Sequence, residues 1–192
     1  ILPYGGGTIF SGTAAVDHNN TLGKQKGDIK TLIACFTLAK KPFYQALAYS
    51  TDKGRTFELL NEGKAIVPNQ GFDLAERDPK LFWHPAPSKT SGVAEAMPGQ
   101  AAGTSEASGK WITVLWLGET SKGRIRIFSS TDLRNWKFES DIVRRWAGEC
   151  FELFELPVLD KDGNLPEGDK LQKKWVIFDG NLDYEVGSFD GN

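Results

Sequence analysis

Three stretches of the sequence combine carboxylates with neighbours that can tune their chemistry: residues 9–17, 76–83 and 146–154. In the second stretch, Asp78 lies between Arg77 and a proline at the entrance to an apolar segment, where the guanidinium would hold a nearby carboxylate ionised. In the third, Glu149 follows a glycine and precedes an apolar run, an environment that can raise a carboxyl pKa as a general acid requires. Both patterns suit acid–base chemistry, although a turn salt bridge at Asp78 and an exposed Glu149 ahead of a strand stay open as structural interpretations.

Short apolar segments rich in β-branched and aromatic residues must position these carboxylates. Residues 124–128 alternate polar and apolar side chains, which is the period of a half-buried strand. No window sustains the apolar i, i+3, i+4, i+7 pattern of a helix over three turns, so the sequence predicts an all-β chain. The expected strands are residues 8–16, 31–37, 45–50, 80–83, 111–117, 124–129, 151–158, 175–178 and 184–189.

One local pattern occurs twice in the chain. Residues 48–57 and 127–136 each give a strand, a Ser-Thr-Asp turn and an aromatic residue that begins the next strand. An aspartate at a turn can accept hydrogen bonds from the backbone two residues on, and Gly54 tolerates a positive φ. Repeated antiparallel sheets with such turns indicate propeller blades, with a sandwich of two similar hairpins as the alternative.

Residues 85–109 interrupt the succession of strand-like segments. The segment is rich in Ala, Gly, Ser and Pro and has almost nothing to pack into a core. It is predicted to be a long loop inserted between two strands of one blade.

Charge and composition exclude several classes of partner. The chain has 192 residues, 23 of them basic and 25 acidic, for a net charge of −2. That balance, without a basic run, argues against nucleic acid or an anionic membrane as partner, and no apolar stretch approaches the roughly 20 residues of a membrane span. Cys35 and Cys150 are predicted to be isolated buried thiols rather than a disulfide. His18 and His84 are too few and too isolated to predict a zinc site.

Taken together, these segments resemble glycoside hydrolase family 32, the β-fructosidases that include invertase, inulinase and levanase. The match runs in family order through almost the whole chain. The segments that carry it are Phe-Ser-Gly-Thr at 10–13, Asp-x-x-Asn-Thr at 17–21, the hairpin at 45–57, Arg-Asp-Pro at 77–79, Glu-Cys at 149–150 and the strand at 184–191.

The resemblance implies a five-bladed β-propeller, of which this chain would hold about three blades plus flanking strands, with a funnel-shaped pocket. It implies retaining hydrolysis of β-fructofuranosyl bonds in levan, inulin or sucrose without a cofactor or metal. By residue match, Glu149 would be the general acid/base and Asp78 the transition-state stabiliser. Arg77 would contact sugar and orient the carboxylates, and Phe10 and Ser11 would line the fructose subsite.

The chain also departs from the family pattern. The nucleophilic aspartate of the family lies in a Trp-Met-Asn-Asp-Pro-Asn-Gly-like motif, and residues 1–192 contain none; residues 17–20 look similar but follow Phe10 and belong to a later turn. Where the family commonly has Pro-Asp after Glu-Cys, this chain has Phe-Glu, which leaves the leaving-group subsite undefined. The chain is therefore expected to be an internal piece of a larger enzyme that is inactive alone and self-associates, or pairs with missing segments, through open sheet edges.

Two other interpretations keep the propeller but change the chemistry. The turn at 50–57 is similar to the Asp-box of sialidases, and related propellers that cleave other sugars also use carboxylates. Alternatively, the domain binds sugar without catalysis, with Trp83, Trp116 or Trp146 stacking on the rings. Extracellular or periplasmic location is expected only from the polymeric substrates that the resemblance implies.

Overall fold

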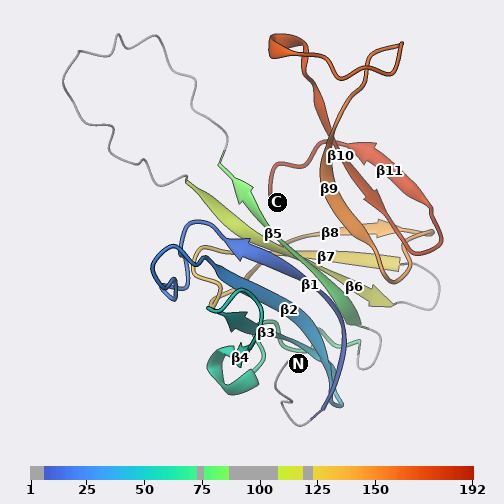
Figure 1. Cartoon of the computed structure of the whole chain (residues 1–192). Helices are drawn as coiled ribbons and strands as arrows, with labels where there is room; N and C mark the ends of the chain where they lie inside the picture. The colour runs from blue at the N-terminus through green and yellow to red at the C-terminus, as the bar shows by residue number, and fades with distance from the viewer. Residues whose placement is uncertain (1–6, 73–75, 87–107, 119–122) are drawn as a thin grey trace.

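The computed structural model describes residues 7–72, 76–86, 108–118 and 123–192, which form three antiparallel sheets (Figure 1). The first sheet contains β1 (Thr8–Asp17), β2 (Thr31–Ala39), β3 (Tyr44–Ser50) and β4 (Glu58–Leu59). The second contains β5 (Glu76–Pro85), β6 (Gly109–Gly118), β7 (Gly123–Ser130) and β8 (Lys137–Arg144). The third contains β9 (Glu152–Pro157), β10 (Lys173–Phe178) and β11 (Tyr184–Gly187). Two short 3-10 turns complete the described elements: η1 (Leu60–Gly63) and η2 (Gly168–Lys170).

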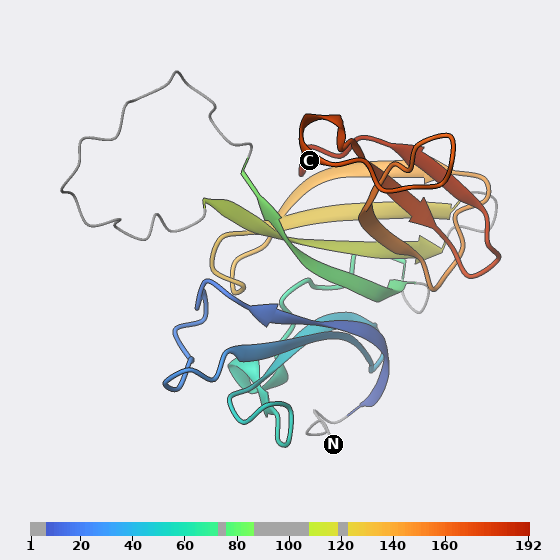
Figure 2. The same ribbon diagram turned by 45° about the horizontal axis from the view of Figure 1, so that its top comes forward.

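Each sheet is a meander in which sequence neighbours pair, so the strand orders are β1-β2-β3-β4, β5-β6-β7-β8 and β11-β10-β9. The first strand of the first sheet, β1, lies against the first strand of the second, β5 (Figure 2). Sheets that succeed one another in this way are propeller blades. The prediction of an all-β chain that forms part of a propeller is confirmed, and the described part of the chain contains no helix long and apolar enough to cross a bilayer.

The core explains why residues 111–117 form a continuous apolar run. Along β6, Trp111, Leu115 and Leu117 pack into the cluster shared with the first sheet. Ile112 and Val114 point the other way, into the cluster shared with the third sheet. Since successive side chains of a strand point to opposite faces, a strand that is buried on both faces is almost entirely apolar; the one polar residue of this run, Thr113, is itself buried.

Every expected strand is present, but the sequence analysis missed β4 and β8. β8 pairs only with β7 and is the outer strand of its blade. Its side chains are partly or fully exposed and mostly polar, so it lacks the apolar pattern on which the expectation depended. The outer strand of a blade is thus the element that hydrophobic periodicity finds least well.

The repeated Ser-Thr-Asp pattern forms the same turn in two blades. In the β3–β4 turn, Ser50 Oγ accepts a hydrogen bond from Gly54 N at 2.9 Å, and Asp52 Oδ1 accepts two backbone N–H groups at 2.9 and 3.0 Å. In the β7–β8 turn, Ser130 Oγ accepts one at 2.8 Å and Asp132 Oδ1 accepts two at 2.7 and 2.8 Å. Because both turns join the third and fourth strands of a blade, the repeat is structural.

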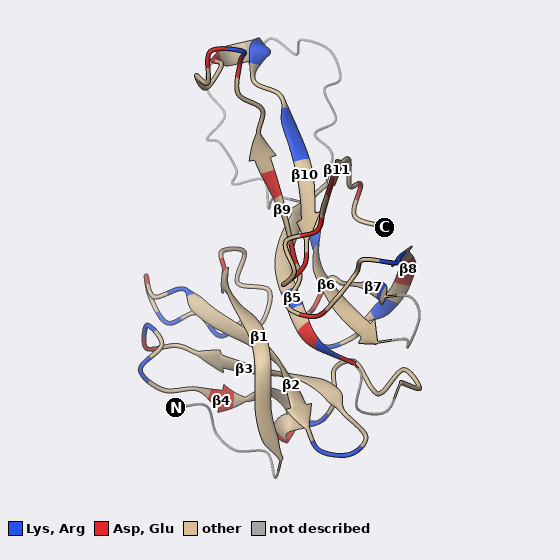
Figure 3. Cartoon of the chain, turned by 90° about the vertical axis from the view of Figure 1, so that its right-hand side faces the viewer, with Lys and Arg blue, Asp and Glu red and all other residues tan. Residues whose placement is uncertain are grey.

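Residues 87–107 of the predicted insertion at 85–109 lie outside the described residues, so the insertion stays a prediction. Figure 3 shows that the β9–β10 hairpin projects from the rest of the described chain, with acidic and basic residues along it. This hairpin exposes several apolar side chains: Leu156, Val158, Leu159, Leu165 and Leu171. The assignment of residues 1–192 to one partial propeller domain and the expected self-association both stay predictions.

Candidate active site

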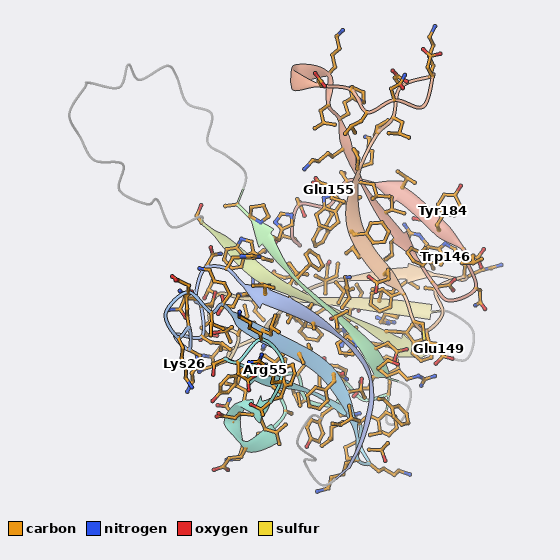
Figure 4. The ribbon with its side chains drawn as sticks, viewed as in Figure 1. Lys26, Arg55, Trp146, Glu149, Glu155 and Tyr184 are labelled. Atoms are coloured by element: carbon orange, nitrogen blue, oxygen red, sulfur yellow. The ribbon has the colours of Figure 1, made fainter. Side chains whose placement is uncertain are left out.

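The residues that sequence analysis singled out lie at or just before the first strands of the three blades: Phe10 and Ser11 early in β1, Arg77 and Asp78 at the start of β5, and Glu149 before β9. Figure 4 labels Glu149 in the connection between β8 and β9. The structure brings Ser11 and Asp78 to one hollow and joins Arg77 to Glu149, whereas Phe10 packs elsewhere. A hollow of about 180 Å³ lies between these strands. Its lining comes from all three blades: Ser11, Gly12 and Thr13; Asp78 and Pro79; Cys150, Phe151 and Glu152.

A β-bulge sits at the start of two of these strands. The register of β1 against β2 shifts between Ile9 and Gly12, and that of β5 against β6 shifts between Arg77 and Lys80. Asp78, inside the second bulge, has φ 61°. Bulges bend a strand and change the direction of its side chains, and they are common next to active sites.

Gly12 is required by the bulge of β1. A Cβ atom at this position would lie 2.0 Å from the Cys35 carbonyl oxygen on β2. We therefore expect Gly12→Ala to lower the free energy of unfolding by about 2–3 kcal/mol, because the two backbones must separate. Chemical denaturation measures this change. The control is Gly187→Ala, where the added methyl meets no atom within 4 Å; equal losses in the two variants would contradict the prediction.

Asp78 is nearly buried, with 8% of its surface exposed, and is fixed from two blades. Its backbone N–H donates to Thr37 Oγ1 at 3.2 Å, while its Oδ2 accepts the Cys150 N–H at 3.0 Å. The Cys150 thiol also lies 3.7 Å from Oδ2. Partial desolvation, followed by the negative charges of Asp78 and Glu149, raises the pKa of this thiol. The bond from Cys150 places the neighbouring Glu149 beside the Asp78 bulge.

Arg77 binds Glu149 across the gap between the second and third blades. Its Nε and Nη2 donate to Glu149 Oε2 at 2.8 and 2.6 Å, and its guanidinium lies 4.4 Å from the centre of the Trp116 ring. The Trp116 indole N–H in turn donates to the Ala147 carbonyl at 3.2 Å. The Glu149 side chain remains 54% exposed. The site therefore holds one nearly buried carboxylate, Asp78, and one that solvent and ligand can reach, Glu149, which is bound by an arginine.

Phe10 and Ser11 differ in their relation to the hollow. Ser11 lines it, whereas Phe10 packs edge-on against Phe43 with ring centroids 5.4 Å apart. Phe10 keeps 42% of its surface exposed. Their predicted role in sugar binding stays a prediction.

Sequence analysis missed the groups that hold Glu149 in place. The Gly148 N–H donates to the buried Asp179 Oδ2 at 2.9 Å, and the Gly180 N–H donates to the Glu149 carbonyl at 3.1 Å. Both partners belong to the β10–β11 turn, about 30 residues further along the chain. An aspartate and a glycine directly after the apolar run of β10 mark a turn, but nothing in the sequence links that turn to Glu149.

A second ion pair joins the same two blades. Lys80 of β5 pairs with Glu152 of β9. Glu149 and Glu152 thus have different partners, Arg77 and Lys80. The cysteine prediction needs one correction: Cys35 and Cys150 are both free, but only Cys35 is buried, since Cys150 lies in the turn before β9 rather than inside the strand.

In the described ranges no group of three His, Cys, Asp or Glu side chains is arranged to hold a metal ion.

Glu76, next to Arg77, is a buried carboxyl outside the hollow. Both of its oxygens lie 2.8 Å from the Gln70 backbone nitrogen, and burial raises its pKa from 4.5 to about 7. Between these two pH values the unfolded chain ionises this group while the folded chain keeps it protonated. Rising pH therefore favours the unfolded state over this window, by up to about 3 kcal/mol.

Glu76→Gln is expected to remove the loss of folding stability that the rise in pH causes. Denaturation at pH 4.5, 6 and 8 should show stability that falls with pH in the original protein more steeply than in the variant. The exposed Glu167→Gln is the control and should keep the original pH dependence. Parallel pH profiles for Glu76→Gln and the original protein would contradict the raised pKa.

The fold and the site together define part of a β-propeller, with two carboxylates, Asp78 and Glu149, near the start of its blades. Residues 3–97 match the family model described as "Glycosyl hydrolases family 32 N-terminal domain". The chain is 36% identical over its whole length to a levanase of Bacillus subtilis, and 32% identical over 95% of its length to an extracellular exo-inulinase of Meyerozyma guilliermondii. The chain belongs to glycoside hydrolase family 32.

Solved structures agree with this assignment. The crystal structure of an exo-inulinase from Aspergillus awamori superposes on 96% of this chain with a TM-score of 0.63 and 25% identity, covering 36% of that enzyme. The chain spans 25% of the length of the levanase and 32% of that of the Meyerozyma exo-inulinase. These similarities concern the part of the relatives that corresponds to the described blades.

Proposed function

We propose that the protein is a retaining glycoside hydrolase that cleaves β-fructofuranosyl bonds in fructans or sucrose. The observation that carries the proposal is the arrangement of Asp78 and Glu149 where three blades meet in a family 32 chain: Arg77 binds Glu149, and the N–H of the next residue, Cys150, binds Asp78. The relatives named levanase, exo-inulinase and invertase support levan, inulin and sucrose as the substrates to test.

In this proposal the accessible Glu149 acts on the glycosidic oxygen. It donates a proton to that oxygen as the bond to the anomeric carbon breaks, while a nucleophilic carboxylate bonds to the same carbon. Glu149 then takes a proton from the water that displaces the carboxylate and releases fructose. No motif of residues 1–192 matches the family's nucleophile, so we assign that role to no residue of this chain.

Asp78 and Arg77 are given supporting roles. The nearly buried Asp78 carboxylate would accept hydrogen bonds from fructose hydroxyls and stabilise positive charge as it develops on the sugar. Arg77 would contact the sugar and keep Glu149 directed at the leaving oxygen. Ser11 and Phe10 would border the fructose ring.

The test is fructose release from sucrose, inulin and levan by the full-length protein that contains this chain. We expect release from at least one substrate, with the anomeric configuration retained when the product is followed by NMR. A folded full-length protein that releases no fructose would overturn the proposal and favour the sugar-binding alternative.

The sialidase-like alternative finds less support in the site. Asp52 and Asp132, which carry the similarity to an Asp-box, use their carboxylates to accept backbone N–H groups of their own turns. These turns lie in the β3–β4 and β7–β8 connections, whereas the hollow lies at the start of β1 and β5.

Arg77→Lys tests the positioning of Glu149. A lysine cannot make the forked contact or stack on Trp116 in the same way, so we expect kcat/KM to fall about 10- to 100-fold. Steady-state kinetics on sucrose measures the loss. Arg134→Lys in the exposed β7–β8 turn is the control and should change little; an unchanged kcat/KM in Arg77→Lys would contradict the assigned role.

A further inference from the structure

A second hollow, of about 470 Å³, lies where β1 and β5 end, at the opposite end of these strands from Glu149 (Figures 1 and 4). Four segments line it: the turn after β1, the end of β5, the start of β6 and the turn after β7. The side chains that they contribute are Asn19, Asn20, Thr21, Trp83, Ser108 and Thr131. None of these lining side chains is charged.

The β1 turn is held rigidly at this hollow. The buried Asp17 carboxylate accepts the Thr21 and Leu22 N–H groups at 2.8 and 2.9 Å. The indole N–H of the buried Trp111 donates to Thr21 Oγ1 at 3.0 Å. These bonds tie the backbone of the turn to the core of the second blade and fix the position of the Thr21 hydroxyl.

Trp83 is fixed as firmly. Its ring packs edge-on against Trp111, with centroids 5.6 Å apart. On the other strand, a Cβ atom at Gly109 would come within 2.6 Å of Trp83 Cζ2, so the indole lies directly against the glycine backbone. The absent side chain at Gly109 therefore provides the space that the indole occupies.

Several polar groups at the hollow have capacity for a ligand. Within the described part of the chain, the Asn19 and Thr131 side chains make no hydrogen bond. Asn20 uses its Oδ1 to accept the Gln25 N–H at 2.9 Å, which leaves its amide NH₂ group as a donor. A pre-positioned indole surrounded by uncharged hydroxyl and amide groups matches a neutral, polyhydroxylated ligand and offers no counter-charge to an ion.

We propose that this hollow is a second carbohydrate site, which binds a fructan chain remote from the candidate active site. The identity of the sugar rests on the proposed function, whereas the chemistry of a neutral saccharide rests on the hollow alone. A chain bound here would hold the protein on polymeric substrate while Glu149 acts on a chain end.

The experiment uses full-length protein with Glu149→Gln, which is expected to slow hydrolysis, labelled with 5-fluorotryptophan. The ¹⁹F lines of Trp83 and Trp116 are assigned from Trp83→Phe and Trp116→Phe. Because Trp116 stacks on Arg77, its line reports the candidate active site, and Trp83 reports the second hollow. Levan oligosaccharides are the titrant.

We expect a saturable shift of the Trp83 line, and a Kd from that line at least about 5-fold weaker in Asn19→Ala/Thr131→Ala, since two hydrogen-bonding groups are lost. A shift of Trp116 with a stationary Trp83 line would overturn the second site and leave the proposed function intact. A shift of Trp83 with a stationary Trp116 line would support the second site and count against the active-site assignment. A Trp83 shift that the double variant does not weaken would also overturn the proposal.

Discussion

Glu149→Gln is expected to lower kcat on sucrose by about 10²- to 10⁴-fold, the usual contribution of a general acid–base group. The glutamine keeps the shape of the side chain and can still accept a bond from Arg77, but it has no proton to give to the leaving oxygen. Since 54% of the Glu149 side chain is exposed, the substitution removes no core packing and should leave the fold intact.

The leaving group separates this role from a positioning role. A fructosyl substrate whose leaving group departs without protonation, such as fructosyl fluoride, should restore the first step in the variant. The second step would still lack its base, and added azide should accelerate it by attacking the glycosyl-enzyme without base assistance. Glu152→Gln, which removes the ion pair with Lys80, is the matched control and should show no azide rescue. In the presence of azide, a loss in Glu149→Gln that is equal for sucrose and fructosyl fluoride would contradict the acid–base assignment.

The sequence predicted most of the strands because they depend on local patterns: apolar runs and alternation identify strands that bury one or both faces. The motifs at Arg77, Asp78 and Glu149 are contiguous in sequence, so candidate roles could be assigned to them, and those roles stay predictions. β8 was missed because its polar side chains face solvent along the outer edge of a blade. The position of β8 is determined by its pairing with β7, and a local sequence pattern does not predict such a pairing.

The geometry of the site depends on contacts between segments that are distant in sequence. Arg77 and Glu149 are 72 residues apart, as are Asp78 and Cys150. The sequence places an arginine next to Asp78 and suggests that it serves that carboxylate, whereas the structure directs its guanidinium to Glu149. The positive φ of Asp78 comes from the bulge in β5, and the residue types around it do not predict that bulge. Sequence motifs therefore identify the chemical groups, and strand register decides which of them meet.

Asp78→Asn is the second substitution with a large expected effect, a fall in kcat of about 10²- to 10³-fold on sucrose. The asparagine has nearly the same shape, and it tolerates the left-handed backbone that Asp78 adopts at φ 61°. Its amide oxygen can still accept the Cys150 N–H, so the loss would come from the missing negative charge beside the sugar. Asp162→Asn, in an exposed loop, is the control and should retain full activity.

The Cys150 thiol provides a readout of Asp78 that is independent of turnover. The charge of Asp78 and its contact with the sulfur both raise the pKa of this thiol, so neutralising Asp78 should lower that pKa. The pH profile of Cys150 alkylation by iodoacetamide should therefore move to lower pH in Asp78→Asn, and Asp162→Asn should leave it unchanged. If the alkylation profile stays in place, the Asp78 charge does not act on the Cys150 thiol and the local electrostatics described above are wrong. A lower thiol pKa together with lost turnover would show that the substitution removes the Asp78 charge while the contact with Cys150 is kept, so the loss of turnover would be due to the charge.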